Sequence, residues 1–121
     1  MKNEIRIGEG WDIHRLVPEK TLVLGGVEVP SPLGEDAHSD GDVLLHAVID
    51  ALLGALALGD IGDHFPPSRE EYKNIKSTIL LKRVLSLTDG WEITNIDTTL
   101  VLEKPKLKEY KEKIRHNLSL L

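Results

Sequence analysis

The sequence predicts an α+β fold in a single domain over residues 1–121, with a small mixed β-sheet and helices packed on one face. Three observations support this prediction. Isoleucines alternate with charged residues at 4–7, and 92–102 is rich in Ile, Thr and Val, as expected of strands. Residues 43–58 are apolar nearly all round a helix, which indicates a central, buried helix.

A hairpin and the central helix are the next elements that the sequence defines. Residues 21–24 and 27–29 flank a Gly-Gly turn, which predicts a β-hairpin. The central helix is expected over 40–58. Ser39 is its expected N-cap, because Asp42 stands three residues later as in a capping box.

Two further helices are expected after the central one. The Gly and Pro content of 60–67 predicts a loop. Ser68 is expected to cap a second helix that reaches about Leu87. A basic, amphipathic helix is expected over 107–121, with its charged face in solvent.

Composition excludes several classes of function. The formal net charge of −5 argues against nucleic acid, because phosphate backbones are met with a surplus of Lys and Arg. The chain has no cysteine, so any metal must be held by His and carboxylate side chains. The longest apolar run, 43–58, is too short to span a membrane, and the N-terminus lacks an apolar signal region. We therefore expect a cytoplasmic protein.

Asp12, His14 and His46 are the candidate metal ligands. In an extended segment Asp12 and His14 point to the same side, and an unpaired His46 inside an apolar helix would cost free energy. Three N and O ligands leave one tetrahedral position open, as in catalytic zinc sites; manganese and cobalt also suit such ligands. Asp50, one turn after His46, either satisfies a core histidine or orients a metal-bound ring.

His38 and Ser39 directly precede the central helix. Unpaired N–H groups and partial positive charge at a helix start suit phosphate, so a metal nearby suggests chemistry on a phosphorylated substrate. Alternatively, Ser39 is only a cap and His38 only a surface residue. Asp60 similarly either contacts ligand hydroxyls or belongs to a simple helix stop.

Several motifs stand in a characteristic order. They are Gly-x-Asp-x-His at 10–14, His-Ser-Asp-Gly-Asp at 38–42 followed by His46, and Leu-Gly-Asp-Ile-Gly at 58–62. With Phe-Pro at 65–66 they resemble the 2-C-methyl-D-erythritol 2,4-cyclodiphosphate synthase (IspF) family of the non-mevalonate isoprenoid pathway. The resemblance covers nearly the whole chain.

The resemblance implies an IspF-like homotrimer with active sites between subunits. It assigns a divalent metal, zinc above all, to Asp12, His14 and His46, and the catalytic contact with phosphate to His38. It implies magnesium on the substrate diphosphate. The substrate-binding positions that it implies are Asp12, His14, His38, Ser39, Asp60, Ile61, Gly62, Phe65, Pro66, Pro105, Lys106 and Leu107.

The implied activity is that of a phosphorus–oxygen lyase. It converts the cytidine diphosphate-linked compound 4-diphosphocytidyl-2-C-methyl-D-erythritol 2-phosphate to 2-C-methyl-D-erythritol 2,4-cyclodiphosphate and CMP. The family continues after the last helix into a strand with a Thr-Thr and a Glu that bind diphosphate and magnesium. A chain that ends at Leu121 is expected to lack this strand and to be poorly active.

Pro67 and Arg69 depart from the family, which commonly has polar or acidic residues in this substrate loop. Two other functions fit the same residues. One is a metal-dependent phosphoesterase with zinc-bound water as nucleophile. The other is a non-catalytic oligomer in which the metal only stabilises the fold.

Overall fold

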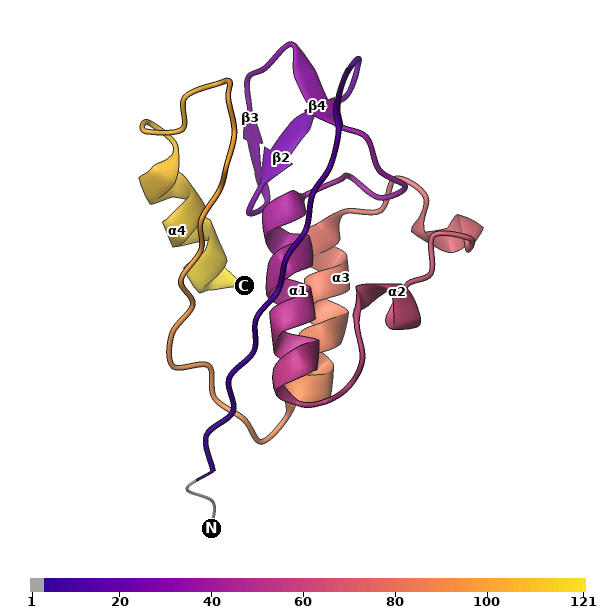
Figure 1. Cartoon of the computed structure of the whole chain (residues 1–121), viewed down its shortest axis with the longest axis vertical. Coiled ribbons are helices and arrows are strands. Elements are labelled where there is room, and N and C mark those ends of the chain that lie inside the picture. The colour runs from indigo at the N-terminus through magenta and orange to yellow at the C-terminus, as the bar shows by residue number, and fades with distance from the viewer. Residues whose placement is uncertain (1–3) are drawn as a thin grey trace.

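A computed structural model of the chain describes residues 4–121, so the first three residues of the predicted domain lie outside it. Helices α1 (Val43–Ala55) and α3 (Ser77–Leu85) pack side by side, with small strand pairs beyond the start of α1 (Figure 1). The α+β class is confirmed. No helix among the described residues is long and apolar enough to cross a bilayer.

The strands form two separate antiparallel pairs, so the predicted mixed sheet is wrong for the described residues. Strand β1 (Leu16–Pro18) pairs with β4 (Leu33–Glu35), and β2 (Leu22–Leu24) pairs with β3 (Val27–Val29). The second pair confirms the predicted hairpin. The two turn residues, Gly25 and Gly26, have φ angles of 62° and 80°, which residues with a Cβ atom rarely adopt.

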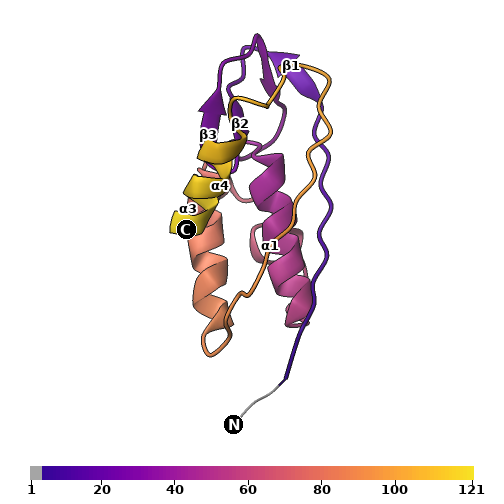
Figure 2. The ribbon, with the colours of Figure 1, turned by 90° about the vertical axis from the view of Figure 1, so that its left-hand side faces the viewer.

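Residues 4–7 and 92–102, both predicted as strands, are extended but pair with no strand in the described part of the chain. Both segments run along α1 (Figure 2). Alternating side chains favour a strand locally, but a strand also needs a hydrogen-bonded neighbour. Neither segment has such a neighbour here.

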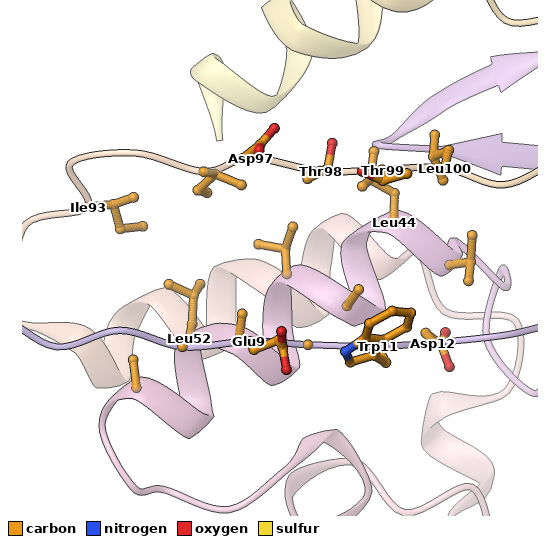
Figure 3. A pocket seen from close by; sticks show the side chains of 18 of the residues that line it. Glu9, Trp11, Asp12, Leu44, Leu52, Ile93, Asp97, Thr98, Thr99 and Leu100 are labelled. Carbon is orange, nitrogen blue, oxygen red and sulfur yellow. The ribbon is translucent and has the colours of Figure 1, made fainter.

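A cleft of about 1160 Å³ separates these two extended segments. Figure 3 shows residues 93–100 along one side and residues 9–12 along the other, with α1 behind them. Much of the cleft is apolar, and it reaches Asp12 and His14 at one end.

Helix α1 begins three residues later than predicted, and its N-cap is Asp42 instead of Ser39. The Asp42 carboxylate accepts hydrogen bonds from the backbone N–H of Leu45 at 3.0 Å, Gly25 at 2.9 Å and Gly26 at 2.6 Å. One side chain therefore caps α1 and joins it to the β2–β3 turn.

Between α1 and α3 the chain forms shorter helical elements than the sequence predicts. The expected loop contains a short helix, α2 (Ile61–His64), with Asp60 as N-cap in a capping box. The expected long helix from Ser68 is wrong at its start, because only a 3-10 turn (Glu70–Tyr72) forms there. Asn74 follows with φ of 58°, which interrupts any helix before α3.

The last helix, α4 (Lys111–Leu120), lies within the predicted range and docks on the hairpin through Ile114. A second 3-10 turn, Ser86–Thr88, ends α3. The main core lies between α1 and α3. Its buried residues are Leu45, Val48, Ile49, Leu53, Leu80, Leu81 and Val84. This packing fixes the half of α1 that carries His46.

Candidate active site

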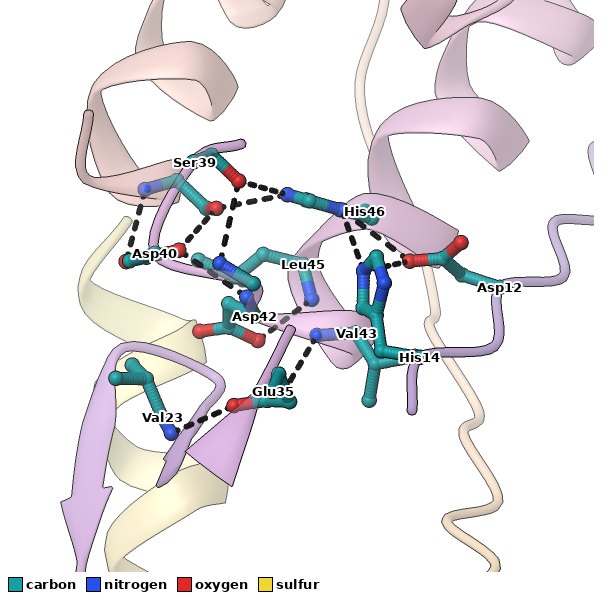
Figure 4. A network of polar contacts seen from close by, with 12 residues as sticks. Asp12, His14, Val23, Glu35, Ser39, Asp40, Asp42, Val43, Leu45 and His46 are labelled. Carbon is teal, nitrogen blue, oxygen red and sulfur yellow. Dashed lines mark hydrogen bonds and ion pairs between the residues drawn. The ribbon is translucent and has the colours of Figure 1, made fainter. Parts of the chain in front are cut away.

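Asp12, His14 and His46 meet at one point, as the sequence predicts (Figure 4). Asp12 Oδ2 lies 2.8 Å from His14 Nε2 and 3.2 Å from His46 Nδ1, and the two nitrogens are 3.2 Å apart. Ligand atoms around a tetrahedral zinc ion are separated by about 3.3 Å, because Zn–N bonds are about 2.0–2.1 Å. The donor set therefore fits a divalent cation such as zinc.

Close contact between the N-terminal segment and α1 brings the three ligands together. A Cβ atom on Gly10 would lie 1.9 Å from the backbone oxygen of Ala47, so only glycine permits this approach. Asp12 and His14 follow directly and reach His46, which lies near the start of α1.

The electrostatics of the site favour a bound cation. Burial alone would raise the pKa of Asp12, but the adjacent imidazole rings of His14 and His46 and their charge interactions with the carboxylate outweigh it and hold this pKa well below its usual range. The hydrogen bond to Asp12 raises the pKa of His14, although burial opposes this shift. The carboxylate thus stays ionised and available to a metal.

Asp50 forms no hydrogen bond with His46, contrary to both sequence interpretations. Its Oδ1 instead accepts a hydrogen bond from the backbone N–H of Ile61 at 2.8 Å, which holds α2 against α1. The far nitrogen of His46, Nε2, lies 2.9 Å from Ser77 Oγ and 3.1 Å from Ser39 Oγ. The helical spacing of Asp50 and His46 did not predict this, because two serines from other elements occupy the ring edge.

At the start of α1, where the sequence predicts a phosphate site, backbone N–H groups are already hydrogen-bonded within the protein. Glu35 accepts the N–H of Val43 at 3.1 Å, and Asp42 accepts that of Leu45. Two carboxylates thus occupy N–H groups that were expected to face phosphate. The side chains of His38 and Ser39 directly before the helix are half-buried, and Ser39 Oγ lies 3.1 Å from the ring of His46.

His38 also contacts the loop that departs from the family. Its Nε2 donates a hydrogen bond to the backbone oxygen of Arg69 at 2.9 Å. The Arg69 side chain points elsewhere and forms an exposed ion pair with Glu71. The contact from the loop to His38 therefore depends on backbone geometry more than on the identity of residue 69.

The other implied substrate residues fall into two groups. Asp60, Ile61 and Gly62 belong to α2 and its cap, and Phe65 packs edge-on against Tyr72 with ring centroids 5.4 Å apart. Pro66 follows in the same loop. Residues 105–107 line a small surface depression before α4, on the opposite side of α1 from α2 (Figure 1). One chain does not bring the two groups together.

Sequence reasoning missed three polar residues of the site region. They are Glu35, Asp40 and Ser77, of which Glu35 and Ser77 are buried. Asp40 lies within the His-Ser-Asp-Gly-Asp motif, so its position was a usable signal. Ser77 carried no such signal, because it fell inside a longer predicted helix.

The chain matches known proteins over nearly its whole length. The YgbB family matches residues 5–121. The 2-C-methyl-D-erythritol 2,4-cyclodiphosphate synthase of Prochlorococcus marinus (strain MIT 9312) is 54% identical over 120 residues, which cover 96% of this chain and 72% of that protein. The synthase of Nostoc sp. is 51% identical over 121 residues, covering 98% of this chain and 73% of that protein.

Solved structures show the same similarity. The bifunctional IspDF from Campylobacter jejuni has a TM-score of 0.91 and 40% identity, covering 97% of this chain and 32% of that one. A 2C-methyl-D-erythritol-2,4-cyclodiphosphate synthase in its CDP-bound form has a TM-score of 0.89 and 39% identity, covering 95% of this chain and 78% of that one. These matches confirm the resemblance seen in the sequence motifs. The chain therefore belongs to the YgbB family.

Proposed function

We propose that the chain is a cyclodiphosphate synthase of isoprenoid biosynthesis. It converts 4-diphosphocytidyl-2-C-methyl-D-erythritol 2-phosphate to 2-C-methyl-D-erythritol 2,4-cyclodiphosphate and CMP, as a phosphorus–oxygen lyase. One structural observation supports the proposal in addition to the similarity to known synthases. Ser39, next to His38, lies 3.1 Å from the ring of the metal-ligand candidate His46. A phosphate held by His38 and Ser39 would therefore lie beside the triad.

The reaction joins two anions, so the site must reduce their repulsion and align them. An oxygen of the 2-phosphate attacks the β-phosphorus, and the bond from that phosphorus to the CMP oxygen breaks. Asp12, His14 and His46 would hold a divalent metal, zinc in our proposal, which supplies Lewis-acid charge stabilisation when bound. In our proposal Ser39 donates a hydrogen bond to a phosphate oxygen as charge accumulates on it, and the Nε2–H of His38 does the same once it exchanges the backbone oxygen of Arg69 for phosphate.

We assign a second cation, magnesium, to the substrate diphosphate. We also propose a homotrimer with sites between subunits. The placement of α2 and residues 105–107 on opposite sides of α1 supports this assembly. If Asp60 to Pro66 bind the erythritol part and residues 105–107 bind the cytidine part, two copies of the chain must contribute to one site.

The test is product formation combined with metal content. The wild-type protein with zinc, magnesium and substrate should release CMP, observed by phosphorus NMR. His46→Ala should lose bound zinc and reduce CMP formation by at least about a hundredfold, because one of three ligands is gone. His116→Ala, an exposed histidine on α4, is the matched control and should behave as wild type.

Three outcomes distinguish the alternatives. Release of inorganic phosphate without a cyclic product would indicate a phosphoesterase. Zinc binding with neither CMP nor phosphate release would indicate a metal that only stabilises the fold. Full zinc retention in His46→Ala would rule out the proposed triad.

A further inference from the structure

The two ring nitrogens of His46 have different surroundings (Figure 4). Nδ1 faces Asp12 Oδ2 and His14 Nε2, each at 3.2 Å. Nε2 faces the Ser77 hydroxyl at 2.9 Å. His46 is 8% exposed and Ser77 is fully buried, so the serine is the fixed partner of this ring edge.

The proton of the Ser77 hydroxyl is already committed to another partner. Ser77 Oγ donates to Asp40 Oδ1, and the backbone N–H of Ser77 donates to Asp40 Oδ2 at 3.1 Å. Asp40 is itself held by the N–H of Asp42 at 3.1 Å. A hydroxyl has one hydrogen, so Ser77 Oγ can only accept toward His46.

The direction of that contact determines the tautomer of His46. If Ser77 Oγ accepts, Nε2 must carry the proton, and the neutral ring then has its lone pair on Nδ1. That lone pair points to Asp12 and His14, where a metal ligand is needed. A partner behind a metal-binding imidazole commonly fixes its tautomer and orientation in this way.

We propose that Ser77, oriented by Asp40, is a positioning residue that fixes His46 in the Nε2–H tautomer for metal binding. The proposal rests on the metal triad of the proposed function. Ser77 touches neither Asp12 nor His14 and acts only through the ring of His46. It takes the role that the sequence suggested for Asp50.

Ser39 makes a related contact with a different consequence. Its Oγ accepts the backbone N–H of Gly41 at 3.2 Å and lies 3.1 Å from the same Nε2. If Nε2 carries the proton, Ser39 is a second acceptor, and its own hydroxyl hydrogen is free for a phosphate oxygen. Ser77 therefore serves the metal ligand, whereas Ser39 keeps a donor for substrate.

Metal affinity tests the proposal. Ser77→Ala should weaken zinc binding by about ten- to a hundredfold, measured by competition with a chromophoric chelator. Ser77→Thr, which keeps the hydroxyl, should restore most of the affinity. Ser119→Ala removes an exposed serine hydroxyl on α4 and should leave the affinity unchanged. With cobalt in place of zinc, Ser77→Ala should also change the visible absorption bands.

A measurement on the unmutated protein keeps the test independent of folding defects. Nitrogen-15 NMR of the metal-free protein in mildly alkaline buffer reports which ring nitrogen of His46 carries the proton. The Nε2–H form is expected. The Nδ1–H form would overturn the proposal, as would wild-type zinc affinity in folded Ser77→Ala. Failure of the triad itself would appear separately, as zinc retention in His46→Ala.

Discussion

Glu35 and Asp42 are carboxyl side chains enclosed at the start of α1. Glu35 is 3% exposed and Asp42 is 0% exposed. Burial raises the pKa of Glu35 to about 7 and that of Asp42 to about 6, although backbone N–H groups oppose both shifts. Each residue therefore binds a proton more tightly in the folded than in the unfolded protein.

This gives a testable pH dependence of stability. From pH 4.5, the usual pKa of Glu35, to about 7, the folded state holds more protons than the unfolded state. The free energy of unfolding of the metal-free protein should therefore fall as pH rises, by up to about 1.4 kcal/mol per pH unit for each group. His14 acts in the same direction, because its stabilising contribution is lost as pH rises through its raised pKa.

Urea unfolding across pH 5–8 with a chelator present measures this slope. Glu35→Gln removes one titrating group and should flatten the curve, while leaving the part due to Asp42. Asp12 has a lowered pKa, so its contribution is lost only when pH falls below the usual carboxyl range. A free energy of unfolding that increases from pH 5 to 7 would contradict the assignment.

At the scale of elements, the contact between the N-terminal segment and α1 determines the geometry of the candidate metal site. Gly10→Ala would place a Cβ 1.9 Å from the backbone oxygen of Ala47, so the segment must move and carry Asp12 away from His46. We expect a loss of about 1–3 kcal/mol in unfolding free energy, with weaker zinc binding. Urea unfolding and chelator competition measure the two effects.

Gly54→Ala is the matched control for this substitution. Gly54 lies in α1, and a Cβ there would meet no atom within 4 Å. Alanine should stabilise the helix by up to about 1 kcal/mol and leave zinc affinity unchanged. If Gly10→Ala and Gly54→Ala behaved alike, close packing of the segment would not be what positions Asp12.

Elements defined by local signals were predictable from the sequence. The β2–β3 hairpin was predictable because its Gly-Gly turn and flanking apolar residues determine its geometry. Much of α1 was predictable from its long apolar run, which is apolar nearly all round a helix. The triad was predictable from residue type, because a histidine in an apolar helix needs a partner.

The wrong predictions concern a helix cap, a side-chain contact and a strand, each of which depends on residues from distant parts of the chain. Ser39 had the local pattern of an N-cap, but Asp42 takes that place with help from glycines of the β2–β3 turn. Asp50 had the right spacing to contact His46, but the backbone of Ile61 binds its carboxylate. Residues 92–102 had strand composition, but composition does not supply a neighbouring strand.

The whole molecule exposes apolar side chains in its two extended segments. Those most exposed, at 81% or more, are Ile5, Ile7, Trp11, Ile13 and Val101. Exposed apolar groups beside unpaired backbone mark surfaces that are covered by other polypeptide. These features support the proposed homotrimer.

Assembly should therefore be detectable in solution. Light scattering on the zinc-loaded protein should give about three times the chain mass of 13.5 kDa. Backbone amides in residues 4–14 and 92–102 should exchange more slowly with deuterium in the assembled than in the dissociated protein, because association would cover them. A monomeric mass with rapid exchange in both segments would contradict the assembly.

The spacing of the triad along the chain has a further consequence. His14 and His46 are 32 positions apart, so a cation bound by both would close a loop of that length. Such closure removes conformational entropy from the unfolded chain, as a disulfide does in proteins that have cysteine. This chain has no cysteine. In this protein the metal is thus expected to act as a reversible cross-link that ties the N-terminal segment to the central helix.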